Sequence, residues 1–255
     1  YLIGGRRNSE DGYIAPVECS EWLSECIGWR LQYPWIESPA HDDTNGYINS
    51  YRFIERLEPL LRPNEIIVVD VGASMCPVFQ VLHVRPPQRL MTSGGLGEMG
   101  CSLPAAIGAS FATGKGEVLC LAGDGGLMMN LQELQTVAHH KLPIKIIVFE
   151  NDGYSMIKGT HKNLKMPYCG VNKASGVSMP DFCKVAQAFG MAYFDVRTWA
   201  DVDHYLPWLL SHMGPALLQL HVDPEQVYVP RLQPIISDDG KITPPKFSEL
   251  SPLDA

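Results

Sequence analysis

Three short segments place glycine and oxygen-bearing side chains directly after apolar runs of strand length. They are residues 70–74 (Asp-Val-Gly-Ala-Ser), 123–126 (Gly-Asp-Gly-Gly) and 150–154 (Glu-Asn-Asp-Gly-Tyr). Asp124 offers a carboxylate oxygen and Asn151 an amide oxygen, and Mg²⁺ prefers ligands of this kind. The backbone N–H groups of Gly125 and Gly126 lie near the start of a helix expected over 131–140, an arrangement that favours a diphosphate. The residues therefore predict a site for Mg²⁺ and a diphosphate.

Each segment alone is also typical of an ordinary strand-to-helix turn, because glycine, aspartate and asparagine are common turn residues. The pair formed by Asp124 and Asn151 is more specific, since the two residues follow successive predicted strands with a helix between them. The carboxyl ends of parallel strands meet at one edge of a sheet, where ligands bind.

The elements that position these residues alternate between strand and helix. Apolar runs predict strands over 65–71, 117–122, 144–149, 216–222 and, more weakly, 192–196. Helical patterns lie over 51–61, 103–112, 131–140, 180–189 and 201–213. Continuous apolar strands that alternate with helices predict an α/β fold: a doubly wound, mostly parallel, six-stranded sheet with helices on both faces.

The rest of the chain differs in composition. Residues 1–48, with a helical pattern over 19–31, are expected to form an arm and a linker from a preceding domain. Residues 49–229 are expected to form the diphosphate-binding domain, and residues 230–255, rich in proline and aspartate, a tail.

Composition excludes several classes of protein. The 255 residues carry a net charge of −8, so no basic excess exists to neutralise nucleic-acid phosphates. No apolar stretch of about 18 residues is present, so we expect no membrane span. The seven cysteines are scattered with no CxxC spacing, which favours a reducing, cytoplasmic compartment.

A family resemblance adds to this interpretation. Gly123-Asp124-Gly125, followed by Asn151 27 positions after the aspartate, resembles the thiamine-diphosphate motif of the acetolactate synthase and pyruvate decarboxylase superfamily. Residues 92–100, 103–109 and 129–134 are similar to the corresponding stretches of acetolactate synthases. The resemblance covers residues 30–225 and corresponds to the carboxyl-terminal, diphosphate-binding domain of those enzymes.

The resemblance implies roles for individual residues. The Asp124 and Asn151 side chains, with the Gly153 carbonyl, would hold Mg²⁺. The diphosphate would lie among Gly123, Gly125, Gly126, Tyr154 and Ser155, with Ser74 as a side-chain donor. Met99 would bend the thiamine, and its N–H and the Gly97 carbonyl would bond the aminopyrimidine. Met156 would lie against the cofactor and, with Ile157, would line the substrate pocket.

One catalytic part is expected from outside this chain. In the family, a glutamate of a separate pyrimidine-binding domain activates the cofactor, and only about 48 residues precede the domain recognised here. Glu98, Glu133 and Glu150 are not candidates for that role. We therefore expect a fragment or a subunit of a split enzyme that is inactive alone, carries no catalytic residue of its own, and acts in a homodimer or tetramer.

The resemblance implies decarboxylation of a 2-oxo acid, pyruvate being the expected one, and transfer of the two-carbon unit to a carbonyl acceptor. Thr160 stands where biosynthetic acetolactate synthases have a tryptophan that favours 2-oxobutyrate, and Ala73-Ser74 stands where they have Gln-His. Residues 153–163 are similar to a subgroup that includes carboligases acting on keto-sugars. A simple 2-oxo acid decarboxylase and a keto-sugar carboligase of polysaccharide biosynthesis therefore remain alternatives.

Two further hypotheses come from other classes. Residues 95–100 fit the GxGxxG dinucleotide pattern of an NAD-dependent dehydrogenase, with Glu117 about 20 residues on. Against it, Arg89-Leu90-Met91 is a poor strand, and Glu117 falls at the start of a strand rather than its end. A non-enzymatic relic that binds Mg²⁺ and diphosphate is the other hypothesis, and the presence of both Asp124 and Asn151 weighs against it.

Overall fold

The computed structural model describes residues 6–7, 14–15, 19–32, 39–232, 234–237 and 241–246. The chain divides into two units, Tyr1–Glu37 and Ser38–Ala255. In the first unit, β1 (Arg6–Arg7) pairs antiparallel with β2 (Ile14–Ala15), and α1 (Ser20–Gln32) matches the helix expected over 19–31. The domain boundary predicted at residue 48 stays a prediction.

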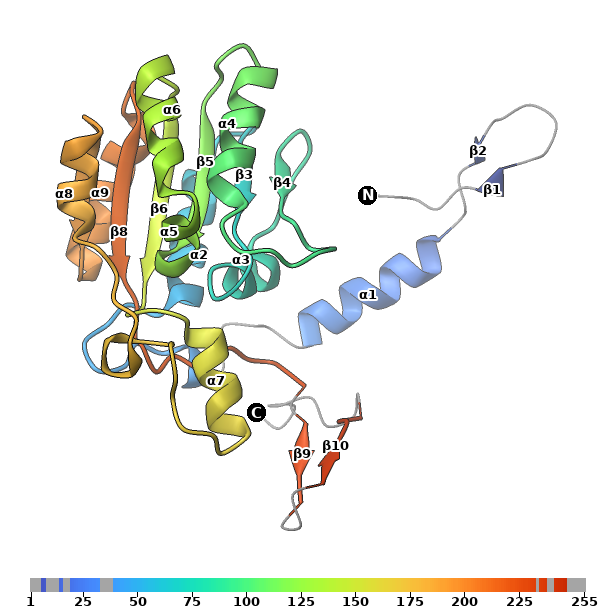
Figure 1. Cartoon of the computed structure of the whole chain (residues 1–255). Coiled ribbons are helices and arrows are strands. Elements are labelled where there is room, and N and C mark those ends of the chain that lie inside the picture. Colours follow the sequence, from blue (N-terminus) through green and yellow to red (C-terminus); the bar gives the residue numbers. More distant parts are fainter. Residues whose placement is uncertain are drawn as a thin grey trace. The chain divides into compact units, whose positions relative to one another are not determined.

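The second unit is built on six parallel strands in the spatial order β4-β3-β5-β6-β8-β7 (Figure 1). Their bounds are β3 Ile66–Val69, β4 Arg89–Met91, β5 Val118–Gly123, β6 Ile144–Glu150, β7 Ala192–Val196 and β8 Ala216–His221. The central strands are buried along nearly their whole length, which explains why their sequences are continuous apolar runs rather than alternating ones. The predicted six-stranded α/β sheet is confirmed.

Helices cover both faces of the sheet. One core joins the even-numbered residues of β5 and β6 to α4 (Ser102–Ala112), α5 (Asp124–Met129), α6 (Leu134–His140) and α8 (Phe182–Ala188). On the other face lie α2 (Ser50–Leu57), α3 (Met75–Val81) and α9 (Trp199–Ser211). On this face the Phe53 ring of α2 meets the Phe149 ring of β6 edge-on at 5.8 Å. The doubly wound arrangement is therefore present, as expected.

Short 3₁₀ segments and one helix complete the connections. α7 (Ser155–Asn163) lies beyond the carboxyl ends of β6 and β8 (Figure 1). The 3₁₀ turns are η1 (Pro39–His41), η2 (Glu58–Leu60), η3 (Leu131–Glu133) and η4 (Lys173–Ser175). Further along the chain, β9 (Ile235–Ile236) pairs antiparallel with β10 (Ile242–Thr243). No helix in the described part of the chain is long and apolar enough to cross a membrane.

The expectation that Arg89–Met91 is a poor strand is wrong. These residues form β4, which pairs with β3 at the edge of the sheet. An edge strand has a neighbour on one side only, so a short run with an exposed arginine can still pair. The segment 95–100 therefore does follow a strand, although Glu117 still precedes β5 rather than ending a strand.

The strand order reverses between β3 and β5. From β3 the chain continues to β4 on one side, whereas from β5 it continues to β6 on the other. Such a reversal separates the loops at the carboxyl ends of the two strands and leaves a crevice for ligands. The three glycine-containing segments singled out in the sequence follow β3, β5 and β6, and they therefore share this edge.

Candidate functional site

Asp124 is the first residue of α5 and follows β5 directly. Its side chain is only 1% exposed, and it accepts three backbone hydrogen bonds. Oδ1 accepts from the N–H of Gly125 at 2.7 Å, and Oδ2 accepts from the N–H groups of Asn151 and Gly153 at 3.1 and 2.9 Å. Asp124 thereby fastens the end of β6 to the end of β5.

The Asp124 carboxyl group is buried without a positively charged partner among the described residues. Burial raises its pKa to about 7, in spite of the N–H donors from Gly153, Gly125 and Asn151, which lower it. The nearby charge of Glu150 raises the pKa further. A buried carboxylate is costly unless it is paired or binds a metal, so this position suits a cation.

Asn151 lies beside Asp124 because of the strand register. Gly123 of β5 is paired with Phe149 of β6, so the residues just after the two strands are neighbours. Asn151 is 4% exposed, and its Nδ2 donates to Ser155 Oγ at 3.1 Å. Its Oδ1 is buried and makes no hydrogen bond of ordinary geometry, although the Tyr228 hydroxyl approaches this side chain. A buried oxygen of this kind needs a partner, and a bound cation would supply one.

The expectation that the N–H groups of Gly125 and Gly126 lie near the start of the helix over 131–140 is wrong, because both residues lie in the first turn of a separate helix, α5. Glycine is a poor helix former, but both positions exclude a side chain. A Cβ at Gly125 would lie 2.4 Å from Cε1 of Tyr154, and a Cβ at Gly126 would lie 2.2 Å from Oδ2 of Asp70. Close packing at the site therefore requires these two glycines.

Asp70 is a site residue whose role the sequence did not reveal. It is fully buried at the end of β3, and its Oδ1 accepts from the N–H of Gly100 at 2.9 Å and of Val71 at 2.9 Å. Burial raises the pKa of its carboxyl group, although these N–H donors oppose the change. Asn130 holds the same loop from the other side, since its Nδ2 donates to the Gly100 carbonyl at 2.8 Å. The position of Asp70 after a strand was the available signal, but its long-range partner at Gly100 was not.

The loop between β4 and α4 contains the predicted residues Gly97 and Met99. Gly97 has a φ of +71° and its N–H donates to the Ser93 carbonyl at 2.8 Å. Gly100 has a φ of +82°, and a Cβ there would lie 2.7 Å from that of Met129. Met99 is half-buried, while the neighbouring Leu96 is 90% exposed. The loop is therefore fixed to the sheet at Gly100 and presents Gly97 and Met99 beyond it.

Gly153, Tyr154 and Ser155 form the turn between β6 and α7. Gly153 has a φ of +125°, and a Cβ there would lie 2.2 Å from the Val171 carbonyl oxygen. The N–H of Tyr154 donates to that same Val171 oxygen at 2.8 Å, so its amide is already engaged. Ser155 begins α7, and the first N–H groups of a helix have no partner within the helix.

The remaining predicted residues differ in exposure. Ser74 is fully buried, and its hydroxyl donates to the backbone carbonyl of Asp70 at 3.2 Å, which engages its one O–H donor. Met156 and Ile157 on α7 are 41% and 48% exposed. The structure thus brings Asp124, Asn151 and the start of α7 together, whereas the Ser74 hydroxyl is bonded to the backbone after β3.

A buried histidine beside this edge was not singled out in the sequence. His221, at the end of β8, lies between Glu150 (Nδ1 to Oε2, 2.8 Å) and Asp195 (Nε2 to Oδ1, 2.7 Å). Burial alone would lower its pKa, but the hydrogen bonds to the two carboxylates outweigh burial and raise it. The pKa of Glu150 is lowered, chiefly by its hydrogen bond to His221.

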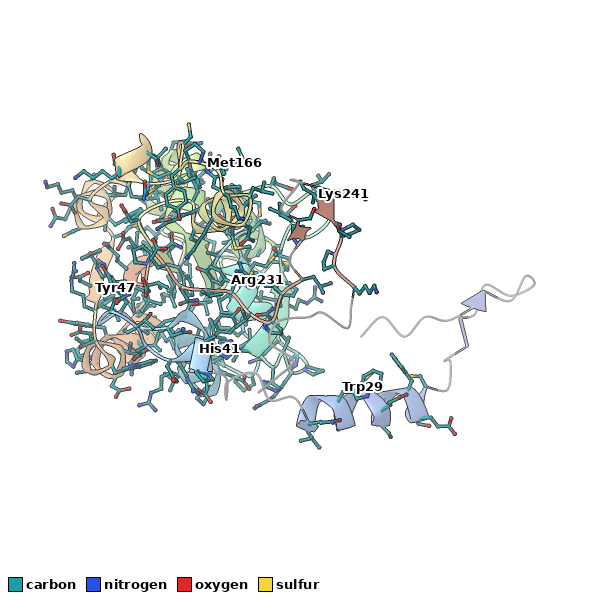
Figure 2. All side chains as sticks on the ribbon, turned by 90° about the horizontal axis from the view of Figure 1, so that it is seen from below. Trp29, His41, Tyr47, Met166, Arg231 and Lys241 are labelled. Atoms are coloured by element: carbon teal, nitrogen blue, oxygen red, sulfur yellow. The ribbon has the colours of Figure 1, made fainter. Side chains whose placement is uncertain are left out.

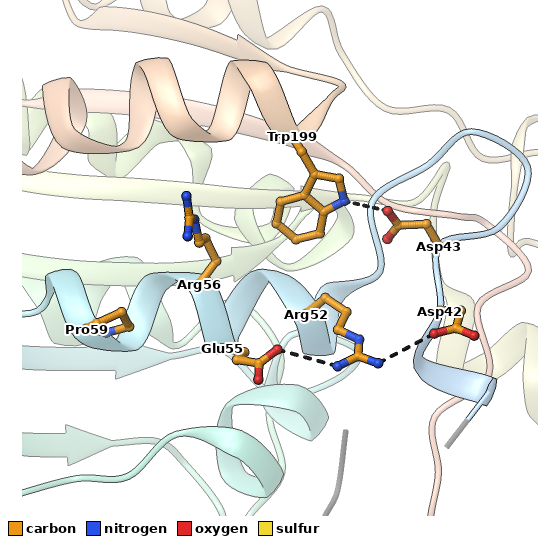
Figure 3. A pocket seen from close by; sticks show the side chains of 7 residues that line it. All are labelled: Asp42, Asp43, Arg52, Glu55, Arg56, Pro59 and Trp199. Carbon is orange, nitrogen blue, oxygen red and sulfur yellow. Dashed lines mark hydrogen bonds and ion pairs between the residues drawn. The ribbon is translucent and has the colours of Figure 1, made fainter. Parts of the chain in front are cut away.

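A hollow of about 450 Å³ lies between α2, the segment before it and the start of α9 (Figure 3). Arg52 pairs there with Asp42 and Glu55, and the Trp199 indole donates to Asp43 at 2.5 Å. None of the predicted site residues lines this hollow.

The fold and the site define a class before any comparison. A parallel α/β sheet with a switch point, a buried carboxylate and amide oxygen on adjacent strands, and helix starts beside them is an arrangement for a phosphate-bearing ligand and a divalent cation.

Comparison with known sequences names the family. Residues 70–220 match the family described as "Thiamine pyrophosphate enzyme, C-terminal TPP binding domain", and the chain belongs to this family. It is 35% identical over 216 residues to the acetolactate synthase isozyme 1 large subunit of Escherichia coli (strain K12), covering 84% of this chain and 37% of that protein. It is 30% identical over 209 residues to the isozyme 2 large subunit of the same organism, covering 82% and 37%. An acetolactate synthase of Arthrospira platensis is 34% identical over 173 residues, covering 68% of this chain and 29% of that protein.

The matched region includes every predicted site residue, from Ser74 to Ile157. The chain spans little more than a third of the length of the two Escherichia coli relatives. The recognised resemblance to acetolactate synthases is thus confirmed at the level of the domain family.

Proposed function

We propose that this chain binds thiamine diphosphate through Mg²⁺ and serves an acetolactate synthase-like enzyme. That enzyme would decarboxylate pyruvate and transfer the two-carbon unit to a carbonyl acceptor. The observation that carries the proposal is the pair at adjacent strand ends. Among the described residues, the buried Asp124 carboxylate has no cationic partner, and the buried Oδ1 of Asn151 accepts no hydrogen bond of ordinary geometry. A cation bound between them would satisfy both groups, and the family membership identifies the phosphate-bearing partner.

Different residues of the chain would bind the Mg²⁺ and the diphosphate. Asp124, Asn151 and the Gly153 carbonyl would hold the Mg²⁺, while the backbone at Gly123, Gly125 and Gly126 and the start of α7 would surround the diphosphate. The thiamine group, when bound, supplies the electron sink that decarboxylation of a 2-oxo acid requires.

Other residues would orient the organic part of the cofactor. Met99, held in place through Gly100 and Asp70, would support the bend of the cofactor, and Gly97 would accept a hydrogen bond from its pyrimidine ring. Met156 and Ile157 would form an apolar wall that keeps water from the reacting carbonyl. These assignments follow the resemblance residue by residue.

The chain would supply half of the site. A pyrimidine-binding domain or subunit would provide the activating glutamate, so we expect the chain to be inactive alone and the active assembly to be a homodimer or tetramer. Residues 49–229 would form the diphosphate-binding domain, with 1–48 as an arm and 230–255 as a tail. The seven cysteines are free, which supports a reducing, cytoplasmic location.

Two measurements test the proposal. Isothermal titration of the chain with thiamine diphosphate should show saturable binding that requires Mg²⁺ and disappears in Asp124→Ala. Release of CO₂ from pyruvate should then appear only when a pyrimidine-binding domain is added. Binding that is independent of Mg²⁺, or no CO₂ release with any such domain, would overturn the respective half of the proposal.

A further inference from the structure

A small cavity of about 90 Å³ lies against α7, on the side of the helix that faces the segment after β8. By this measure one water molecule needs roughly 10–15 Å³, so the cavity has room for a group the size of a carboxylate or a phosphate. Among the described residues that line it, three cations are opposed by a single acid: Lys158, Lys162 and Arg231 against Glu225. Figure 2 labels Arg231 on the segment that follows β8.

The net charge of the groups that line this cavity is opposite in sign to that of the whole protein. The chain as a whole carries −8, whereas the ionisable groups that line the cavity carry a formal +2. Side chains of Ser155, Asn163 and Tyr168 add neutral hydrogen-bond donors to the same wall. This combination of cations and neutral donors suits an oxyanion, in particular one that can accept several hydrogen bonds.

The Lys158 side chain is buried and fixed by several contacts. It is only 8% exposed, its Nζ donates to the Pro224 carbonyl at 3.2 Å, and it pairs with Glu225. Its ammonium also lies 5.7 Å from the centre of the Tyr168 ring. An ammonium has three N–H groups, so one remains for a ligand after these two hydrogen bonds.

The backbone of α7 leaves the cavity open on the side of Arg231. Gly159 faces the guanidinium, and a Cβ at that position would lie 3.9 Å from Nη1 of Arg231. A larger side chain at residue 159 would therefore extend into the space beside the arginine. The absence of a side chain at Gly159 leaves this space beside Arg231 unfilled by α7.

The cavity and the proposed cofactor site share one helix. Ser155 lines the cavity and is also the first residue of α7, where its Oγ accepts from Asn151. Met156, part of the proposed wall of the substrate pocket, lies three positions before Gly159 and seven before Asn163, which both line the cavity, so the three residues share one face of α7. A ligand whose reacting carbonyl lies at this wall could therefore place a second group in the cavity.

We propose that this cavity binds the anionic group of the acceptor, a carbonyl compound that carries a phosphate or a carboxylate away from its reacting carbon. Lys162 and Arg231 provide the selectivity for that group, and Lys158 with Glu225 shapes the cavity. That the anion belongs to an acceptor substrate rests on the proposed function. Whether the cavity binds an anion can be tested separately.

The first experiment tests the anion site alone. The full chain is saturated with thiamine diphosphate and Mg²⁺, so that the diphosphate site is filled, and inorganic phosphate is then titrated by calorimetry. Lys162→Gln and Arg231→Gln should each weaken phosphate binding by roughly tenfold to a hundredfold, the range for a hydrogen bond to a charged group. Lys184→Gln, which removes an 80% exposed lysine on α8, should bind phosphate as the wild type does. Equal phosphate binding by wild type and both cavity variants, or no saturable binding, overturns the proposal.

The second experiment tests the acceptor and separates the two anion types. In the enzyme completed by a pyrimidine-binding domain, pyruvate is the donor, and glyceraldehyde, glyceraldehyde 3-phosphate and succinic semialdehyde are compared as acceptors. Lys162→Gln and Arg231→Gln should raise KM for one or both anionic aldehydes and leave CO₂ release from pyruvate unchanged. The aldehyde whose KM rises identifies phosphate or carboxylate as the preferred group.

The outcomes distinguish the two proposals. Normal CO₂ release, with all three aldehydes used equally by wild type and variants, overturns the acceptor assignment only. Absence of CO₂ release overturns the proposed function, and the phosphate titration still decides whether the cavity binds an anion.

Discussion

Replacement of Asp124 by asparagine should make the stability of the ligand-free protein, relative to the wild type, rise between pH 5 and pH 8, and should abolish its response to Mg²⁺. The reason is the burial of the carboxyl group, which raises its pKa from 3.8 to about 7 in the folded state. Because the folded pKa lies above the unfolded one, the folded state binds more protons between these values. The free energy of unfolding therefore falls as pH rises towards 7 and stays low above it.

The magnitude follows from the pKa. Between pH 5 and the folded pKa of about 7, the wild type should lose about 2–3 kcal/mol, at 1.36 kcal/mol per pH unit. Asparagine does not titrate between pH 5 and pH 7. The free energy of unfolding of Asp124→Asn, relative to that of the wild type, should therefore rise by the same amount over this range. The amide must turn its NH₂ towards at least one of the three backbone donors, which costs about 1–3 kcal/mol at every pH. The variant should thus be less stable than the wild type at pH 5, and equal to it or more stable at pH 8.

Urea unfolding followed by circular dichroism measures this difference at both pH values, with EDTA and with Mg²⁺ plus thiamine diphosphate. At 100 times the dissociation constant, the ligands should stabilise the wild type by about 2.7 kcal/mol and leave Asp124→Asn unchanged. Asp152→Asn, an exposed acid in the next turn, is the matched control and should behave as the wild type does. A pH-independent difference between Asp124→Asn and the wild type, or equal stabilisation of both by the ligands, would refute the reasoning.

Three further predictions concern single positions. Gly126→Ala should lower the free energy of unfolding, measured in urea, by about 1–3 kcal/mol, because its Cβ would meet Asp70. Gly108→Ala, in a helix with open space around that position, should be neutral or stabilising. Equal effects of the two substitutions would contradict the packing argument. His221→Gln should destabilise the protein most below pH 6.5, and progressively less as pH rises through the raised pKa of the histidine in the folded state. A loss of unfolding free energy that instead grows with pH would contradict a raised pKa. Asn151→Ala should weaken Mg²⁺-dependent cofactor binding at least about tenfold in calorimetric titration, because one ligand oxygen is lost; unchanged affinity would exclude the asparagine as a ligand.

Much of the fold could be predicted because the central strands are buried on both faces. Such strands read as uninterrupted apolar runs, and those of β5, β6 and β8 match their predicted ranges closely. The edge strand β4 was rejected because a strand of three residues, one exposed and two half-buried, leaves no such pattern. Pairing with β3 stabilises it, and that partner is distant in sequence.

The site was predicted in part. The types of Asp124 and Asn151 and their place after strands were enough to predict that they meet. The helix α5 was missed because two glycines in its first turn lower its intrinsic propensity, and only their close packing against Tyr154 and Asp70 explains them. Likewise, no local pattern could show that Asp70 fastens the loop at Gly100, since that hydrogen bond joins residues 30 positions apart.

The parallel register of β5 and β6 has a consequence for how this sequence can change. Asp124 and Asn151 are 27 positions apart because α5, η3 and α6 connect β5 to β6. The contacts at the site do not depend on the length of this connection. Extra residues in the turn at 141–143, at the far ends of the strands, would leave both ligands where they are. One residue inserted within β6 would instead move Asn151 by about 3.3 Å and turn it to the opposite face. Insertions and deletions should therefore be tolerated at one edge of the sheet and lethal to cofactor binding within the strands, so a deletion scan of β6 and its preceding turn would map the site without altering any ligand.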